Sequence, residues 1–532
     1  RWLSDWSSDV CSSDLTNSSN KRIAKNTLML YFRMLIILGV RLYTSRIILN
    51  TLGVEDYGIY NVVGGIVVML SFMSSAMSAG TTRFLSFELG RADLKKMARV
   101  FSMSLNIHAT IAVFIFLLAE TLGLWFLNTH LNIPAERMNA ANWAYQFSIF
   151  TFIIAVLSIP YHALIIAHER MNVYAYVSIV EVSLQLFIVF MLQWFGYDKL
   201  KLYAVLVFVV SLLIRVIYGL YSSKNFKESQ YRFIWDKSLY KTLMSFAGWN
   251  LWGNVAGVLS GQGVNMLLNI FFGPAVNAAR GIAWQVKAAI HNFVGNFQTA
   301  MNPQIIKSYA ANDLKYMHQL ISQGAKYSFF LLFFLSLPIL LETKIILQLW
   351  LKIVPEYTII FTQLVIVNVL IDCFSGPLIT AAQASGRIKA YQMVVGGLLI
   401  LILPLSWLFL KFGYPPQVTI YISIFFSVLA LIARLWILQN LVRLKVKEFI
   451  VKVVLKSTFV CFVALILPLI VHSSIEESFQ RFISVVLVSM ISTSVTIYLI
   501  GLEQNERLFF IRIVKKQYGN FITDSKVFFY RK

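Results

Sequence analysis

Long apolar stretches recur along the chain and are separated by short polar connections. They lie near 27–50, 57–82, 101–127, 141–166, 173–195, 202–221, 244–272, 276–302, 327–341, 357–380, 390–410, 415–438, 451–471 and 482–500. A bilayer core about 30 Å thick needs about 20 apolar residues for each helical span. The pattern therefore predicts an all-α, polytopic membrane protein with about fourteen transmembrane helices, of which the ninth looks short.

The composition supports lipid as the main solvent. Hydrophobic residues make up 58% of the 532 residues, charged residues only 13%, and the mean hydropathy is +0.71. An ordinary soluble domain is excluded by these values. Ser4–Leu15 (SDWSSDVCSSDL) resembles the in-frame translation of a sequencing adapter. We therefore expect the native chain to start between Thr16 and Lys21.

Lysine and arginine are unevenly divided between the two ends of the predicted helices. The connections on the side of the N-terminus, with the C-terminal tail, contain 31 of them, whereas the opposite connections contain seven. Because basic connections stay in the cytoplasm, both termini are predicted to be cytoplasmic. The net charge of +22 reflects this asymmetry and an affinity for anionic headgroups, so nucleic acid is not an expected partner.

Two halves of the chain resemble each other at a spacing of about 220 residues. Asp93-Leu94-Lys95-x-Met97 recurs as Asp313-Leu314-Lys315-x-Met317, and a second set relates Pro160 to Pro377 and Arg170 to Arg387. Ser102 and Gly53 likewise match Ser322 and Gly273. Six helices are an even number, so the copies enter the membrane in the same direction. The repeat predicts two parallel six-helix lobes and two further helices.

The predicted organisation has four parts. Residues 1–20 are the adapter-like start, 21–222 form the N-terminal lobe, 223–442 form the C-terminal lobe, and 443–532 hold the two further helices and a basic cytoplasmic tail.

The eighth predicted helix carries a stripe of cations. At about 100° per residue, Arg280, Lys287, His291 and Gln298 fall within about 20° of one line. Charge inside a membrane is costly, so such side chains face a cavity or a partner. One interpretation is that these cations reach the interface or pair with distant carboxylates. The other is a water-filled cavity whose cationic wall binds an anion.

The seventh predicted helix has Gly253, Gly257 and Gly261 at four-residue spacing among polar residues. The polar residues that could line the cavity are Asn250, Asn254 and Gln262, with Gln298 from the eighth helix. The glycines indicate close helix packing, a bendable cavity wall, or both. By the repeat, Arg33 and Arg41 of the first helix correspond to Gly253 and Gly261, so the arginines could face small residues of the other lobe.

Three carboxylates lie inside predicted spans, Glu120, Glu181 and Asp372. Each could carry a coupling proton or cation, or could pair with an arginine. Glu181 and Asp372 are the candidates for ion coupling. No metal site or disulfide framework is indicated, because Cys373 and Cys461 lie in apolar helices without CxxC or Cys/His spacing.

Arg46–Arg91 (RIILNTLGVEDYGIYNVVGGIVVMLSFMSSAMSAGTTRFLSFELGR) resembles the start of bacterial polysaccharide-biosynthesis flippases of the Wzx type, which serve O-antigen, capsule and exopolysaccharide. These belong to the superfamily of multidrug, oligosaccharidyl-lipid and polysaccharide exporters, with the MATE exporters and the lipid II flippase. The resemblance covers the chain from about Lys21, and its most specific stretch is Leu52–Val63. It implies two six-helix lobes that work by alternating access.

The resemblance also implies a substrate. Similar proteins move undecaprenyl-pyrophosphate-linked oligosaccharide across the bacterial inner (cytoplasmic) membrane, and cavity cations serve the pyrophosphate. The candidate headgroup ligands here are Arg280, Lys287, His291, Arg33 and Arg41. Further expected partners are membrane lipids, a glycan polymerase and glycosyltransferases, and the protein is expected to act as a monomer without a cofactor.

Two other classes of function remain as alternatives. Cation-coupled drug exporters commonly use acidic residues in the first and seventh helices, where this chain has arginine and amides. An ion-coupled exporter of the MATE type is therefore the second hypothesis. An enzyme is not expected, because no HExxH, GxSxG or P-loop motif occurs and the longest outside connection has about 15 residues.

Overall fold

The computed structural model describes most of the chain between Asn26 and Arg507. The described residues are 26–40, 44, 47–48, 51–52, 56, 59–60, 63–64, 71–130, 133–195, 197–272, 274–351, 354–504 and 506–507. The adapter-like segment, Arg41 and the glycine pair of the repeat lie outside them. Every described element of regular structure is a helix, so the all-α, polytopic class is confirmed.

The first group of helices follows the described helix Asn26–Val40. It comprises α2 (Ser71–Gly90), α3 (Leu94–Leu118), the π-helical η1 (Ala119–Gly123), α4 (Leu124–His130), the short η2 (Ala135–Arg137), α5 (Met138–Ala167), α6 (Met171–Trp194) and α7 (Lys199–Asn225). Within this group, α5 packs against α2, α3 and α7. We call this group, together with the helix Asn26–Val40, the N-lobe.

The second group begins after the short η3 (Lys227–Ser229). It comprises α8 (Lys237–Val258), the π-helical η4 (Leu259–Gly263), α9 (Val264–Phe272), α10 (Pro274–Ala310), α11 (Leu314–Leu341), α12 (Thr343–Leu351), α13 (Thr358–Asp372), α14 (Ser375–Ser385), α15 (Lys389–Lys411) and α16 (Val418–Leu441). Here α10 packs against α11, α13 and α14, and α15 packs against α8 and α16. We call it the C-lobe.

The chain then forms a helical hairpin on the outside of the C-lobe. It comprises α17 (Val446–Phe449), the π-helical η5 (Ile450–Leu455), α18 (Lys456–Ser474), α19 (Phe479–Thr496) and the π-helical η6 (Ile497–Gly501). Both long helices pack on α11. We call residues 446–501 the accessory hairpin.

Within the described residues, nine helices are long and apolar enough to cross a membrane, or ten if α13 and α14, which are bent by 40°, count as one span. Four other predicted spans correspond to helices that do not pass this test: Asn26–Val40, which is apolar but too short, and α2, α8–α9 and α10, which are too polar. Their polar content has a structural reason. Except for the short first helix, these are the helices through which the two lobes touch, because α2 packs against both α8 and α10.

Two predicted boundaries are corrected. The second helix extends to Gly90, so Arg83 lies inside α2 and is buried rather than in a basic connection. The ninth helix is not short, because α11 starts at Leu314, where Asp313 accepts a hydrogen bond from the Tyr316 amide. Its first three turns are polar, and a hydropathy pattern detects only the apolar remainder. Lys326 therefore lies inside a helix.

Turns at equivalent points of the two lobes have the same backbone conformation. Ala92 and Asn312 both have positive φ, at 57° and 61°, just before the capping residues Asp93 and Asp313. Glu169 and Gly386, which the second set of the repeat places in register, have φ of 58° and 72°. A left-handed backbone conformation is unfavourable for most residues other than glycine and is therefore uncommon. Two such matches at equivalent points support the repeat.

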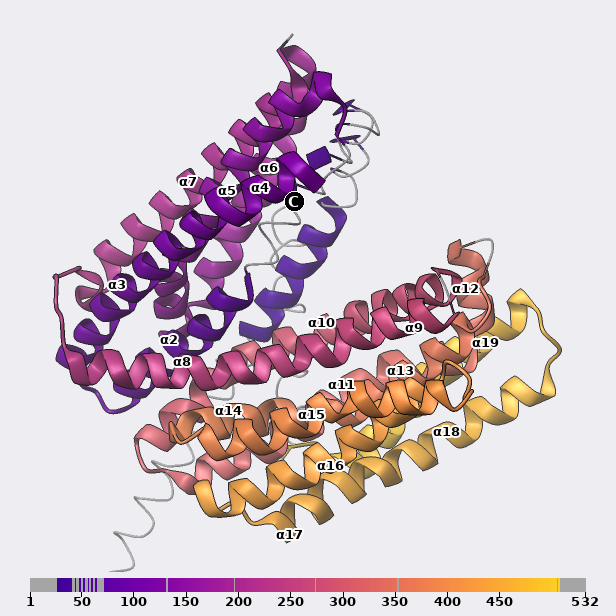
Figure 1. Ribbon diagram of the computed structural model, residues 1–532. Coiled ribbons are helices and arrows are strands. Elements are labelled where there is room, and N and C mark those ends of the chain that lie inside the picture. The colour runs from indigo at the N-terminus through magenta and orange to yellow at the C-terminus, as the bar shows by residue number, and fades with distance from the viewer. Residues whose placement is uncertain are drawn as a thin grey trace, which may run out of the picture.

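The lobes meet at one end and diverge toward the other, as Figure 1 shows. The end where they meet includes the C-terminus of α2 and the starts of α3, α8, α11 and α15, which carry most of the basic connections. We call it the basic end, and the charge rule predicts that it faces the cytoplasm. Contact there is tight, since a Cβ at Gly90 would lie 2.7 Å from Cα of Lys307.

Buried polar contacts join the lobes at the basic end. Glu169, between α5 and α6, is 7% exposed, accepts a 2.6 Å hydrogen bond from Gln304 and forms an ion pair with Lys307, both on α10. Arg83 of α2 donates to the backbone carbonyls of Gln383 and Ala384 at 3.0 and 2.8 Å. We call the contacts of Glu169 with Gln304 and Lys307 the Glu169 latch.

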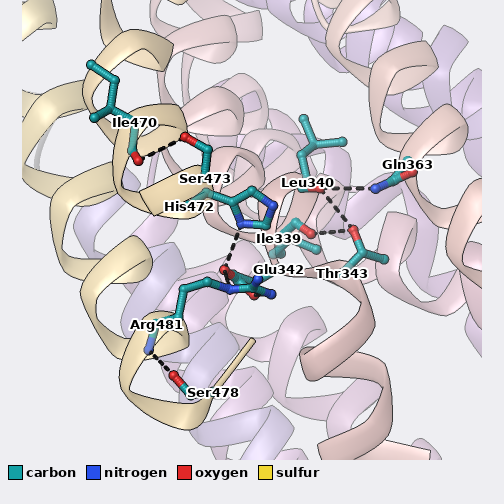
Figure 2. Close-up of polar contacts among 10 residues, drawn as sticks. All are labelled: Ile339, Leu340, Glu342, Thr343, Gln363, Ile470, His472, Ser473, Ser478 and Arg481. Atoms are coloured by element: carbon teal, nitrogen blue, oxygen red, sulfur yellow. Dashed lines mark hydrogen bonds and ion pairs between the residues drawn. The ribbon is translucent and has the colours of Figure 1, made fainter. Parts of the chain in front are cut away.

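Charged contacts fasten the accessory hairpin to the C-lobe (Figure 2). Glu342, at the end of α11, is 1% exposed, and its carboxylate accepts from Arg481 at 3.0 and 3.2 Å and lies 3.0 Å from Nδ1 of His472. At the basic end, Lys326 forms a 2.7 Å ion pair with Glu506. The hairpin is therefore held to α11 at its turn, and the residues that follow it are held to α11 by Lys326.

Replacing Glu342 by glutamine should loosen the hairpin. The neutral amide removes the counter-charge of a largely buried arginine, and breaking such a pair costs about 3 kcal/mol. We expect a clear fall in the thermal unfolding midpoint in detergent. Glu477→Gln is the matched control, because its 2.9 Å pair with Lys344 is exposed, and exposed ion pairs contribute little to stability. Equal falls in the two variants would contradict the assigned role of Glu342.

Candidate functional site

The predicted cation stripe lies on one unbroken helix. Pro274 begins α10, a position where proline's missing N–H is not needed. The helix continues for 37 residues, so the angular relation of Arg280, Lys287, His291 and Gln298 holds in the structure. Their surroundings differ along the helix, which contacts α2 of the N-lobe and α9, α11, α13 and α14 of the C-lobe.

Arg280 is held by the π-helical segment of the neighbouring helix. It is 5% exposed, its Nη2 donates to the carbonyl of Gly261 at 3.1 Å, and its guanidinium lies 4.0 Å from the ring centre of Trp284. Among the described residues, no carboxylate forms an ion pair with Arg280. A guanidinium has five donors, so Arg280 retains capacity to bind an anion.

Lys287 and His291 share an acidic neighbour. Lys287 lies 5.4 Å from the ring centre of Trp284, and both Lys287 and His291 interact electrostatically with Asp372. Asp372 is the last residue of α13, where the bend toward α14 begins. The predicted ion-coupling carboxylate is therefore close to two of the predicted headgroup ligands.

The glycines of the seventh helix divide into two classes. A Cβ at Gly253 would meet the side chain of Gln392, and one at Gly263 would lie 2.7 Å from Leu403, so these positions serve close packing. A Cβ at Gly257 or Gly261 would meet nothing within 4 Å. Close packing therefore does not explain Gly257 and Gly261. Gly261 belongs to η4 and Gly257 lies just before it, and π-helical segments are frequent at functional sites.

The predicted lining residues have different environments. Asn250 is 4% exposed and accepts from Gln392 at 3.1 Å, and Gln298 donates to Ser328 at 3.1 Å, so both are packed within the C-lobe. Asn254 donates to Ser75 of the N-lobe at 3.2 Å. Gln262, in η4, is exposed.

Arg33 does not face the glycines of the other lobe. Its guanidinium lies 4.5 Å from the ring centre of Tyr174 on α6, and the space beside Gly253 is filled by Gln392. This corrects the expectation that Arg33 opposes Gly253, and the corresponding expectation for Arg41 lies outside the described residues. Glu181, the second predicted coupling carboxylate, interacts with Tyr218, as Arg33 does, so both belong to one polar cluster inside the N-lobe.

Sequence reasoning missed three aromatic or charged residues. Trp284 contacts both Arg280 and Lys287, and its position one turn from each was a usable signal. His162 and Arg215 interact with each other in the N-lobe cluster. Arg215 was detectable as a lone cation in a very apolar span, since such residues are functional candidates by default.

The family-like segment around Asp56 has a structural role. Arg137 donates to Asp56 at 2.8 and 2.5 Å and to Asp198 at 2.8 and 3.3 Å, at the end away from the basic end. Burial works to raise the pKa of Asp198, but hydrogen bonds from Arg137 and from backbone amides outweigh it, so this pKa is lowered. The network ties the segment to the starts of α5 and α7.

Arg137→Gln should lower thermal stability at neutral pH. A lowered carboxyl pKa stabilises the fold above the unfolded value of about 4, and this stabilisation is lost as pH falls below it. The difference between the wild type and the variant should therefore shrink below about pH 4, as measured by unfolding midpoints in detergent. A difference that stays constant down to pH 3 would contradict the assigned network.

Comparison with known proteins shows where the fold belongs. No protein-family model matches the chain, and no curated protein matches it significantly. A multidrug resistance MATE family transporter of the MOP superfamily, solved in an outward-facing conformation, superposes with a TM-score of 0.66 at 12% identity, covering 80% of this chain and 96% of that chain.

Two further solved structures are similar. The MATE transporter VcmN of Vibrio cholerae, in its bent form, has a TM-score of 0.64 at 16% identity and covers 82% of this chain and 99% of its own. A MOP superfamily transporter from Pyrococcus furiosus, described as having a binding pocket of reverse polarity, has a TM-score of 0.65 at 12% identity. The match covers 80% of this chain and 96% of that transporter. The chain therefore has the fold of the MATE transporters of the MOP superfamily.

Proposed function

We propose that this protein is a flippase that moves undecaprenyl-pyrophosphate-linked oligosaccharide across the bacterial inner membrane by alternating access, for the synthesis of a cell-surface polysaccharide. Arg280 and Lys287 bind the pyrophosphate, with His291, Arg33 and Arg41 as further cationic ligands. The amides of Asn254 and Gln262 meet sugar hydroxyls. The lipid tail stays in the bilayer while the lobes rock.

One observation carries the proposal. No aspartate or glutamate occurs between Asp236 and Asp313, the stretch that contains α8, η4, α9 and α10. The same stretch places the buried Arg280 and the partly buried Lys287 on one helix face, next to the helices that join the lobes. A wall of this polarity favours an anionic substrate over a cationic drug.

The chemistry of the two cations suits a pyrophosphate. A guanidinium presents parallel donors to phosphate oxygens, and an ammonium adds a compact positive charge. Trp284 lies beside both groups. Asp372 serves as counter-charge to Lys287 when the anion is absent, and it is the leading candidate for carrying a coupling ion, with Glu181 as the other.

The second candidate function is ion-coupled export of small molecules or drugs, favoured by the fold, since solved structures with it include a multidrug resistance transporter. A chromosomal deletion separates the two. Flipping predicts loss of surface glycan with unchanged drug susceptibility, and restoration of the glycan by the cloned gene. Normal glycan with increased susceptibility to several drugs would replace the proposal by the exporter hypothesis.

The proposal also implies partners. A flippase of this kind acts between cytoplasmic glycosyltransferases and a glycan polymerase, and contacts membrane lipids throughout its cycle. We propose that it acts as a monomer with both termini in the cytoplasm.

A further inference from the structure

A pocket outside the α10 site lies at the basic end. It has a volume of about 570 Å³ and is formed where α2 of the N-lobe meets α8 and the turn between α14 and α15 of the C-lobe. None of its lining residues belongs to the cation stripe of α10. The pocket therefore lies on the lobe contact that must open in an alternating-access cycle.

The charged side chains that line this pocket are all cations. They are Arg83, Lys241, Arg387 and Lys389, and no carboxylate lines it. None of the four forms an ion pair with a described residue. The carboxylate that acts on Arg83, Glu88, is itself paired with Lys96 at 3.1 Å, and Asp236 is used to cap α8.

The rest of the lining supplies hydroxyl side chains and an aromatic face, although the hydroxyls of Thr242 and Ser385 already donate to the backbone carbonyls of Ser238 and Ala382. Thr242, Ser245 and Trp249 follow one face of α8, and Ser385 precedes the turn into α15. Lys389, the first residue of α15, lies 5.4 Å from the ring centre of Trp249. First-turn amides of a helix have no partner within it, and they favour anions.

Arg83 connects the pocket to the lobe contact. It is 6% exposed, and its guanidinium is held by the carbonyls of Gln383 and Ala384 at the end of α14. Charge-assisted bonds to a phosphate are stronger than bonds to neutral carbonyls. An anion in the pocket would therefore compete with α14 for Arg83.

We propose that this pocket is the first binding site for the phosphate-bearing headgroup of the lipid substrate, on the side from which it enters. The inference rests on the proposed function. It gives these cations a role in substrate binding, whereas the charge rule alone would explain them only as residues that keep their connections in the cytoplasm. The headgroup binds Lys241, Arg387 and Lys389, draws Arg83 away from α14 and so weakens the contact between the lobes. It then passes to Arg280 and Lys287.

The test measures binding of undecaprenyl pyrophosphate to the purified full-length protein in detergent, with undecaprenol as the uncharged probe. The variant is Lys241→Gln/Arg387→Gln/Lys389→Gln, whose three side chains are exposed and outside the α10 site. The control is Lys95→Gln/Lys224→Gln/Lys315→Gln, which removes the same charge from exposed positions of the basic end outside this pocket.

We expect the pocket variant to bind undecaprenyl pyrophosphate roughly tenfold more weakly or worse, because several charge-assisted bonds are lost. The control should stay within about twofold, since scattered exposed charges contribute little. Undecaprenol should bind all three proteins alike. In liposomes, the pocket variant should raise KM more than it lowers kcat.

Equal binding of the pyrophosphate lipid by the pocket variant and the control would overturn the inference. If inorganic pyrophosphate bound the pocket as tightly as the lipid, the site would be one for a free anion, and the lipid assignment would fail. Failure of the proposed function looks different: the wild type would then flip no lipid-linked oligosaccharide in liposomes, even if the pocket bound the headgroup.

Discussion

Alanine at both Arg280 and Lys287 should abolish flipping. Each cation is expected to contribute about 2 kcal/mol through charge-assisted bonds to the pyrophosphate, so their joint loss corresponds to roughly a thousandfold. The effect should be seen as loss of oligosaccharide transfer in proteoliposomes and of surface glycan in a complementation assay. Protein level in the membrane must be measured in parallel.

The matched control for this variant is Gln285→Ala/Asn292→Ala. These two polar residues are exposed on α10 and lie about 120–140° away from the cation stripe. We expect this variant to keep wild-type transport. Full activity of Arg280→Ala/Lys287→Ala would refute the headgroup site, and loss of activity in the control would show that α10 tolerates no substitution. Arg280→Lys should be intermediate, because an ammonium lacks the paired donors of a guanidinium.

Replacing Glu169 by glutamine should shift the protein toward the conformation that is open at the basic end. The change removes the counter-charge of Lys307 in the largely buried Glu169 latch. It should destabilise the conformation closed at the basic end, relative to the open one, by about 3 kcal/mol. A free energy of this size changes the ratio of two conformations roughly a hundredfold. Transport should then fall, because one half of the cycle becomes unfavourable.

Spin labels at Lys95 and Lys315 would measure this shift. These exposed residues occupy equivalent positions at the starts of α3 and α11, one on each lobe. After removal of the native cysteines, Glu169→Gln should lengthen the distance between them. Glu228→Gln is the control, because this buried carboxylate bonds to His168 instead of α10. An unchanged distance in Glu169→Gln would show that the latch does not hold the lobes together.

The helices could be predicted largely from the sequence, because a membrane imposes length and apolarity on every span that faces lipid. The prediction was weakest for α2 and α11. In both, polar residues lie inside the helix: Arg83 at the lobe contact and Lys326 against Glu506. A charge buried in a protein contact resembles a loop charge in a hydropathy pattern.

The candidate site was predictable in part. The stripe on α10 follows from helical spacing alone, and Trp284 could have been added by the same rule. The partner of Arg280 could not, since a backbone carbonyl in a π-helical segment leaves no mark on residue identity. The same holds for the link between Lys287 and Asp372, which are distant in the chain.

The sequence by itself determined that the chain is helical, crosses a membrane and carries cations on one face of α10, and it predicts a repeated six-helix unit, because each of these is a local pattern or a periodicity. The tertiary structure decided which charges are latches, which line a pocket and which glycines are packed. Those roles depend on side chains from distant segments. Only their convergence shows whether a cation meets a carboxylate, a carbonyl or an open pocket.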